Sequence, residues 1–182
     1  MQEHVILVNE QDEVVGFEEK LKTHQDGMLH RAVSVFVFNS SGDILLQKRA
    51  CTKYHSGGMW SNTCCGHPQP GESIKAVGHR RLQEEMGFDC DLQELFSFTY
   101  RAELNGGLVE HELDHVMVGR FDGDPTPNPE EVEAWEWVPL DQLSDKMMQY
   151  PERYSYWFKL SFEKVCELIR GRGLNTSLER VA

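Results

Sequence analysis

The stretch Asn62–Phe88, NTCCGHPQPGESIKAVGHRRLQEEMGF, decides the fold of this chain. Its first residues continue a short apolar and β-branched run, which predicts a strand over Trp60–Cys64. The proline and glycine residues that follow predict a loop over His67–Glu72. A helix is predicted over Ser73–Met86, and Gly87 is the residue expected to end it. The stretch therefore indicates a strand, a loop and a helix that carries several charged side chains.

Two of those charges fall on the apolar side of the predicted helix. At about 100° per residue, the apolar stripe consists of Ile74, Val77, Gly78 and Leu82. Arg81 and Glu85 project into the middle of this stripe, one turn apart. On an exposed face they would form an ordinary ion pair, but burying two charges is costly unless they meet a ligand or a metal. We interpret Arg81 as a phosphate contact and Glu85 as a metal ligand.

Strand patterns lie on both sides of this unit. Strands are expected over Val5–Asn9, Val14–Lys20, Ala32–Asn39, Ile44–Arg49, Leu92–Glu103, Leu108–Phe121 and Val132–Pro139, a loop over His24–Leu29, and helices over Asp141–Gln149 and Tyr154–Arg170. This order predicts an α/β (α+β) fold, a mixed-sheet α/β/α sandwich with N-terminal strands and C-terminal helices. We expect residues 1–170 to form one domain and residues 171–182 to form a flexible tail.

Composition limits the partners of the chain. The net charge of −12 over 182 residues argues against nucleic acid or an anionic membrane surface as a partner, so basic contacts to an anionic substrate must be local. No apolar run is long enough to span a membrane, and the first residues are too acidic for a signal peptide. Because the number of cysteines is odd, we expect a reducing cytoplasm, with Cys51, Cys90 and Cys166 as small buried apolar residues. No dedicated interface pattern is present in the sequence, so we expect a monomer.

Histidines and glutamates suggest a metal centre. The candidate ligands are His24, His30, His67, Glu110 and Glu112. Glu110 and Glu112 are two apart in a predicted strand and leave it on the same face, as does a competitor, Asp114, whereas His111 points away. Such mixed nitrogen and oxygen donors suit zinc, manganese or a similar ion. The remaining histidines are interpreted as ordinary surface or core residues: His4, His55, His79 and His115.

Four blocks of sequence resemble one family, type 1 isopentenyl diphosphate isomerase of the Nudix superfamily. They are HQDGMLHRAVS (24–34), NTCCGHPQPGES (62–73), FTYRAELNGGLVEHE (98–112) and YSYWF (154–158). The opening stretch also has the frame of a Nudix box: Gly66, Glu72, Arg80, Leu82, Glu84, Glu85, Gly87 and Phe88. Arg81 stands where the hydrolase signature has a glutamate. The frame implies a diphosphate substrate and a divalent metal, and the departure favours a reaction other than hydrolysis.

The resemblance implies an enzyme of isoprenoid biosynthesis that interconverts isopentenyl and dimethylallyl diphosphate by protonation and deprotonation through a tertiary carbocation. It implies catalytic roles for Cys65, Glu112 and Tyr100. The implied ligands of a Mn²⁺ or Zn²⁺ ion are His24, His30, His67, Glu110 and Glu112, and those of the Mg²⁺ that accompanies the diphosphate are Glu85 and Cys65. The implied substrate contacts are Lys20, Arg49, Lys53, Arg81 and Trp157.

Such chemistry needs an acid, a base and a pocket that excludes water. The candidate pocket walls are Trp60, Trp157, Phe36 and Tyr100, with Phe36 also interpreted as core. Two other interpretations stay open: a Nudix hydrolase of a diphosphate substrate, and a catalytically inactive binding module. Glu84 supports the hydrolase because it keeps an additional acid beside the magnesium site.

Overall fold

The strands of the computed structural model form one mixed nine-stranded sheet, and the structure describes residues 3–171. They are β1 (His4–Val8), β2 (Val14–Glu19), β3 (His30–Phe38), β4 (Ile44–Arg49), β5 (Trp60–Ser61), β6 (Cys64–Gly66), β7 (Leu92–Glu103), β8 (Val109–Arg120) and β9 (Val132–Val138). The long strand β3 runs parallel to β8 and antiparallel to β6. β7 pairs with β8, β9 with β4, and β2 with β1 at one edge.

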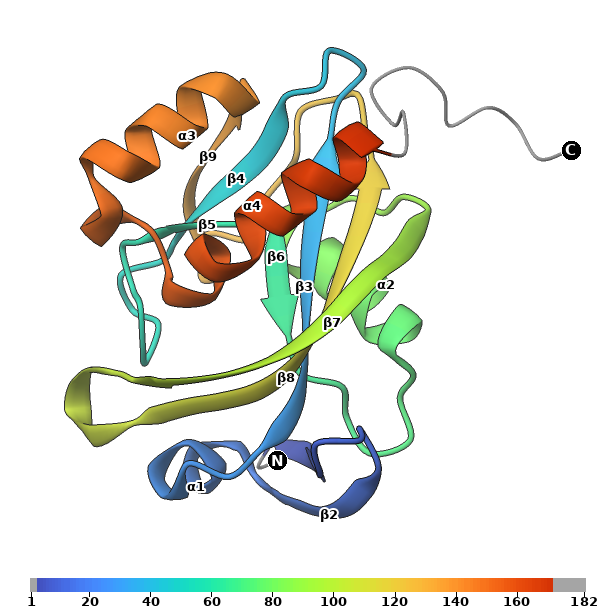
Figure 1. Ribbon diagram of the computed structural model, residues 1–182, viewed down its shortest axis with the longest axis vertical. Helices are drawn as coiled ribbons and strands as arrows, with labels where there is room; N and C mark the ends of the chain where they lie inside the picture. Colours follow the sequence, from blue (N-terminus) through green and yellow to red (C-terminus); the bar gives the residue numbers. More distant parts are fainter. Residues whose placement is uncertain (1–2, 172–182) are drawn as a thin grey trace, which may run out of the picture.

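Helices cover both faces of this sheet. They are α1 (Lys20–Asp26), α2 (Ile74–Met86), α3 (Leu140–Gln149) and α4 (Tyr156–Gly171), with 3-10 turns at Asn105–Gly107 and Pro151–Arg153. Figure 1 shows α3 and α4 on one face, α2 on the other, and α1 at the end of the molecule beneath the β7–β8 hairpin. The predicted α/β/α sandwich is confirmed. No helix in residues 3–171 is long and apolar enough to cross a membrane.

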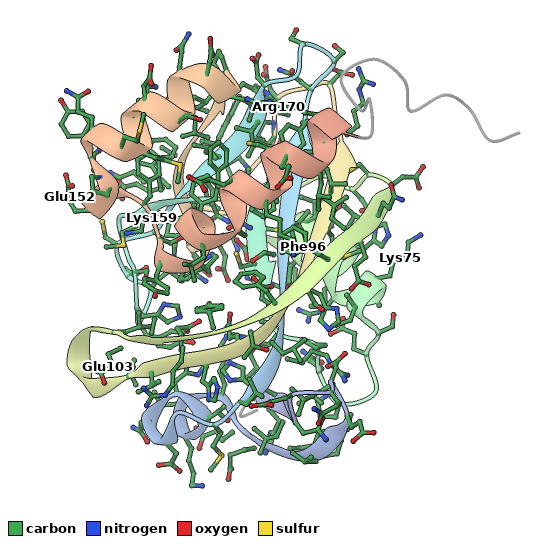
Figure 2. All side chains as sticks on the ribbon, viewed as in Figure 1. Lys75, Phe96, Glu103, Glu152, Lys159 and Arg170 are labelled. Carbon is green, nitrogen blue, oxygen red and sulfur yellow. The ribbon has the colours of Figure 1, made fainter. Side chains whose placement is uncertain are left out.

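The alternation of side chains along β3 builds two cores. Val33, Val35 and Val37 pack in the cluster beneath α2, whereas Phe36 and Phe38 pack with the aromatic residues of α4. Figure 2 shows Phe96 of β7 beneath α4, and this residue packs against the same aromatic cluster. Full burial of such side chains stabilises the fold by about 1.5–3 kcal/mol each. Phe36 is therefore a core residue and not a pocket wall.

Local signals at both ends explain why α2 forms where the sequence predicts it. The Ser73 hydroxyl accepts a hydrogen bond from the Ala76 amide at 3.2 Å and caps the N-terminus. Gly87 ends the helix with a φ of 74°, a left-handed conformation that favours glycine. A Cβ at Gly78 would lie 2.9 Å from Sδ of Met117, so this glycine lets α2 approach the sheet.

Three expectations were wrong. The segment predicted as a loop over His24–Leu29 begins inside α1. The strand predicted over Trp60–Cys64 is two short strands, because the side chains of Asn62 and Thr63 bind backbone carbonyl groups of neighbouring strands between them. Of the three cysteines expected to be buried, Cys51 is exposed, Cys90 is half-buried and Cys166 is buried. Of the predicted tail, Gly171 closes α4, and residues 172–182 lie outside the described part of the chain.

Candidate active site and metal centre

Strand β6 directs its two adjacent cysteines to opposite faces of the sheet. Cys64 pairs with Val35 and is buried under α2, whereas Cys65 pairs with Ser34 and faces a pocket on the α4 side. The Cys65 thiol donates to Oδ1 of Asn62 at 3.2 Å and accepts from Nε1 of Trp157 at 3.1 Å. Burial, followed by nearby carboxylates, raises the pKa of Cys65 to about 12. Cys65 is therefore a thiol at neutral pH and can donate a proton.

The carboxylates of β8 line the same pocket and meet a tyrosine. The Tyr100 hydroxyl lies 2.6 Å from Oε2 of Glu112 and 3.1 Å from Oε2 of Glu110. The β7–β8 register places Tyr100 opposite Glu112, which explains the shorter contact. Burial alone would raise the pKa of Glu112, but the nearby His30 ring and the hydrogen bond from Tyr100 outweigh it and lower the pKa. Glu112 is thus ionised at neutral pH and can accept a proton.

Three histidines converge on these carboxylates. Nε2 of His24 lies 3.0 Å from Oε1 of Glu110, and Nε2 of His67 lies 2.8 Å from Oε1 of Glu112. Nε2 of His30 lies 3.3 Å from Nε2 of His67. The other ring nitrogens of His24 and His30 bond backbone carbonyl oxygens at 2.6 and 2.9 Å, so each Nε2 faces the cluster with a lone pair. This orientation is the usual arrangement of metal-binding histidines.

The donor set fits a divalent ion. Donor atoms of His24, His30, His67 and Glu112 all lie within 4.8 Å of one another, and those of His24, His55 and Glu110 form a second such group. Burial lowers the pKa of His67 well below its usual value, so its ring is neutral and able to bind a metal. Asp114 also shares this face but is bonded to the Ser34 hydroxyl at 2.7 Å and belongs to neither group. His111 points away and bonds the Gly27 carbonyl, as expected.

His55 is a member of the cluster that no sequence pattern indicated. Its Nε2 lies 3.3 Å from Oε1 of Glu110, and its ring stacks on that of His24. Burial lowers the pKa of His55 to about 4, so the ring is neutral at physiological pH. His55 lies in the loop between β4 and β5, where no periodicity assigns a face to a side chain, so the sequence alone favours an ordinary surface or core residue here.

The other end of the pocket is basic. Nη2 of Arg81 lies 2.6 Å from Oε1 of Glu85 and 3.3 Å from Oε2 of Glu131. Burial opposes the charge of Arg81, but Glu85 and Glu131 outweigh it and raise the pKa of the guanidinium. Lys53 also contacts Glu131, and Lys20 lies 3.1 Å from Glu3. The inward direction expected for Arg81 and Glu85 is confirmed, and Glu131 is an additional acid that no sequence pattern indicated.

Two oxygen atoms accept hydrogen bonds from Nε of Arg81. Its Nε donates to the Cys65 carbonyl at 3.3 Å and to Oε1 of Glu85 at 3.1 Å. Oε2 of Glu85 accepts from the Gln47 amide at 2.6 Å. The carbonyl and the carboxylate are therefore neighbouring hard oxygen donors, the type that Mg²⁺ prefers.

One pocket joins the two ends. Its lining includes Lys20, Arg49, Lys53, Cys65, His67, Arg81, Glu85, Glu110, Glu112 and Trp157. The Arg49 guanidinium lies over the Trp157 ring, 5.3 Å from its centroid. Trp60 was expected to be a wall, but it packs against the aromatic core instead, and Tyr100 lies behind the carboxylates. The pocket thus combines a thiol, carboxylates, a metal-type cluster and a basic end with aromatic side chains from Trp157 and Tyr54.

Comparisons with known proteins agree with this geometry. The NUDIX domain family matches residues 28–158. An isopentenyl-diphosphate Delta-isomerase 2 from Aromatoleum aromaticum is 50% identical over 95% of this chain and 93% of its own length. The chain belongs to the isopentenyl-diphosphate Delta-isomerases. The isomerase of Serratia proteamaculans is 52% identical over 87% of this chain and 88% of its own length.

Solved structures agree on the fold. A protein from Deinococcus radiodurans has a TM-score of 0.68 at 24% identity and covers 81% of this chain and 90% of its own length. A MutT protein from Methanosarcina mazei Go1 has a TM-score of 0.64 at 20% identity and covers 79% of this chain and 95% of its own length. At this identity the likeness concerns the Nudix fold alone. Within that fold, the relatives of known name place this chain among the isomerases.

Proposed function

We propose that this isomerase interconverts isopentenyl and dimethylallyl diphosphate, with Cys65 and Glu112 as its proton-transfer groups. The single observation that carries the proposal is that the Cys65 thiol and the Glu112 carboxylate line one pocket, with Trp157 bonded to the thiol and Tyr100 bonded to the carboxylate. Conversion of isopentenyl to dimethylallyl diphosphate requires a proton added at one carbon and a proton removed from another. The Cys65 thiol donates one proton, the Glu112 carboxylate accepts the other, and Tyr100 holds Glu112 in place.

The aromatic wall and the basic end serve the rest of the substrate. The face of Trp157 stabilises the tertiary carbocation between the two proton transfers and keeps water away from it. Lys20, Arg49, Lys53 and Arg81 hold the diphosphate, whose binding energy positions the alkene. Glu85 and the Cys65 carbonyl would hold the Mg²⁺ that accompanies the diphosphate, and this ion would supply positive charge to neutralise the phosphate groups.

The histidine cluster is proposed as a second metal centre for Mn²⁺ or Zn²⁺. Its ligands are His24, His30, His67, Glu110 and Glu112. A bound cation would add positive charge beside Glu112 and hold that carboxylate in its orientation. The monomeric state and the cytoplasmic location expected from the sequence stay predictions, as does a single domain over residues 1–170.

The hydrolase alternative is disfavoured by Arg81. A hydrolase of this superfamily collects several acids on the helix to hold metal and orient a water, whereas here a guanidinium occupies one of these positions and pairs with Glu85 and Glu84. Glu85 is thereby left as the helix carboxylate that faces the pocket. The named relatives also favour the isomerase over the hydrolase.

Proton NMR in heavy water tests the proposal directly. With Mg²⁺ and isopentenyl diphosphate, we expect dimethylallyl diphosphate with solvent deuterium in its methyl groups. Cys65→Ala and Glu112→Gln should each reduce turnover by at least about 10³-fold, because each removes a group that transfers a proton, and should leave the circular dichroism spectrum unchanged. Near wild-type turnover in either variant would overturn the assignment of that residue, and phosphate release without isomerisation would favour a hydrolase.

A further inference from the structure

One oxygen atom of Glu110 lies between two imidazole nitrogens without a hydrogen-bond partner. Oε1 of Glu110 is 3.0 Å from Nε2 of His24 and 3.3 Å from Nε2 of His55. It is buried, and it has no hydrogen bond to any described residue. A buried carboxylate oxygen in this state is costly unless a cation satisfies it. Two donors that are each about 2.1 Å from one ion and at right angles lie roughly 3 Å apart. Both distances match ligands that share an ion.

The ring of His55 is held in place from several sides. It stacks on His24 with centroids 5.9 Å apart, and its edge meets the Trp157 ring at 5.8 Å. The Arg49 guanidinium donates to the His55 carbonyl oxygen at 3.3 Å and fixes the backbone of the loop. Nδ1 lies 3.4 Å from the Ser56 hydroxyl, which leaves Nε2 as the nitrogen that faces Glu110. His55 therefore presents one nitrogen to the cluster from a preorganised position.

Starting from the metal centre proposed above, we propose that His55 is an additional ligand of this ion and binds it through Nε2. The donor set would then consist of four imidazoles and two carboxylates, from the two groups that share His24, and their number would suffice for a six-coordinate ion. A closed set of protein ligands is typical of an ion that organises its surroundings, whereas an ion that activates water or substrate keeps an open position. The ion would accordingly orient Glu110 and Glu112 and leave the diphosphate to Mg²⁺. A nitrogen-rich set also favours Zn²⁺ over Mg²⁺.

The number of bound imidazoles tests this proposal without reference to isomerase activity. The full chain is stripped of metal, loaded with one equivalent of Zn²⁺ and studied by X-ray absorption spectroscopy. We expect four imidazoles in the wild type and three in His55→Phe, which keeps a ring between His24 and Trp157 but lacks a ligand atom. A wild-type count of three, or equal counts in the two proteins, would overturn the proposal. If His55→Phe does not fold, His55→Ala gives the same comparison.

Metal affinity gives a second readout. In competition with a chelator, His55→Phe should bind Zn²⁺ at least about tenfold more weakly than the wild type, because even residues that only support a ligand change affinity by about 10–100-fold. The control is His79→Ala, which removes a histidine that bonds Asp89 outside the cluster, and its affinity should match that of the wild type. Equal affinities of His55→Phe and the wild type would show that His55 only packs against His24 and Trp157 and does not bind the ion. If the protein binds Zn²⁺ through four imidazoles but has no isomerase activity, the proposed reaction is contradicted and the proposed role of His55 is not.

Discussion

Gly66 controls the position of Arg81 at the scale of a single residue. A Cβ at this glycine would lie 2.5 Å from Cγ and 2.9 Å from Cδ of Arg81, so the arginine passes the strand only because no side chain is there. In Gly66→Ala, Arg81 must leave its place beside Glu85. Loss of one charged hydrogen bond costs about 1.5–3 kcal/mol. We therefore expect KM for isopentenyl diphosphate to rise at least about tenfold, as measured by steady-state kinetics.

A second glycine in a strand provides the control for this variant. A Cβ at Gly16 of β2 would meet only Leu7 at 3.8 Å, an ordinary contact, so Gly16→Ala should leave KM and kcat unchanged. If Gly66→Ala kept the wild-type KM, either Arg81 would not contact the diphosphate or the strand would move to accommodate the methyl group. A crystal structure of the variant separates these outcomes by the position of Arg81.

At the scale of elements, an ion pair between Arg80 and Glu72 connects helix α2 to the loop that carries His67. The Arg80 guanidinium donates two hydrogen bonds of 2.8 Å to the Glu72 carboxylate and one of 3.2 Å to the His67 carbonyl. The hydrogen bonds from Arg80 lower the pKa of Glu72, since they outweigh its partial burial. We expect Glu72→Gln to destabilise the fold at pH 7 by about 1 kcal/mol, a value reduced for partial exposure to solvent. Urea unfolding measures this difference.

The pH dependence of that difference has a definite sign. Because the folded pKa of Glu72 lies below the unfolded value, its contribution is fully present above the unfolded pKa, near 4.5. It is lost as the pH falls through the lower folded pKa, when the carboxyl takes up a proton. The stabilities of the wild type and Glu72→Gln should therefore converge as the pH falls through the lowered folded pKa of Glu72. Glu18→Gln, in an exposed pair with Lys22, serves as a control that should change little at any pH. A constant difference down to pH 3 would contradict the proposed pairing.

An element could be predicted from the sequence where caps and an apolar pattern mark it locally. α2 has a capping serine, a terminal glycine and an apolar stripe, and all three are visible in the sequence. α1 has only seven residues and no side-chain cap, so a helix of this length depends on its contacts with β1, β2 and β8, which one sequence does not reveal. The same limit applies to the site. Residues on strands and on α2 could be assigned to faces by periodicity, whereas His55 and Glu131 come from loops.

At the scale of the whole molecule, the histidine cluster joins segments that are far apart in the chain. His24 comes from α1, His30 from β3, His67 from the loop after β6, and Glu110 and Glu112 from β8. A single ion bound to all five would connect the N-terminal elements to the centre of the sheet. Because such a site exists only in the folded protein, the free energy of metal binding adds to the free energy of unfolding.

Removal of metal should therefore lower the stability of the whole fold. A free ion concentration of 100 times Kd stabilises the native state by about 2.7 kcal/mol, which corresponds to roughly 5–10 °C in Tm for a chain of this size. We expect differential scanning calorimetry to show this decrease when Zn²⁺ or Mn²⁺ is chelated. Hydrogen exchange should increase mainly in α1, which the ion holds through His24, and change little in α4, which is held by the aromatic core. An unchanged Tm with uniform exchange would mean that the cluster binds no structural ion.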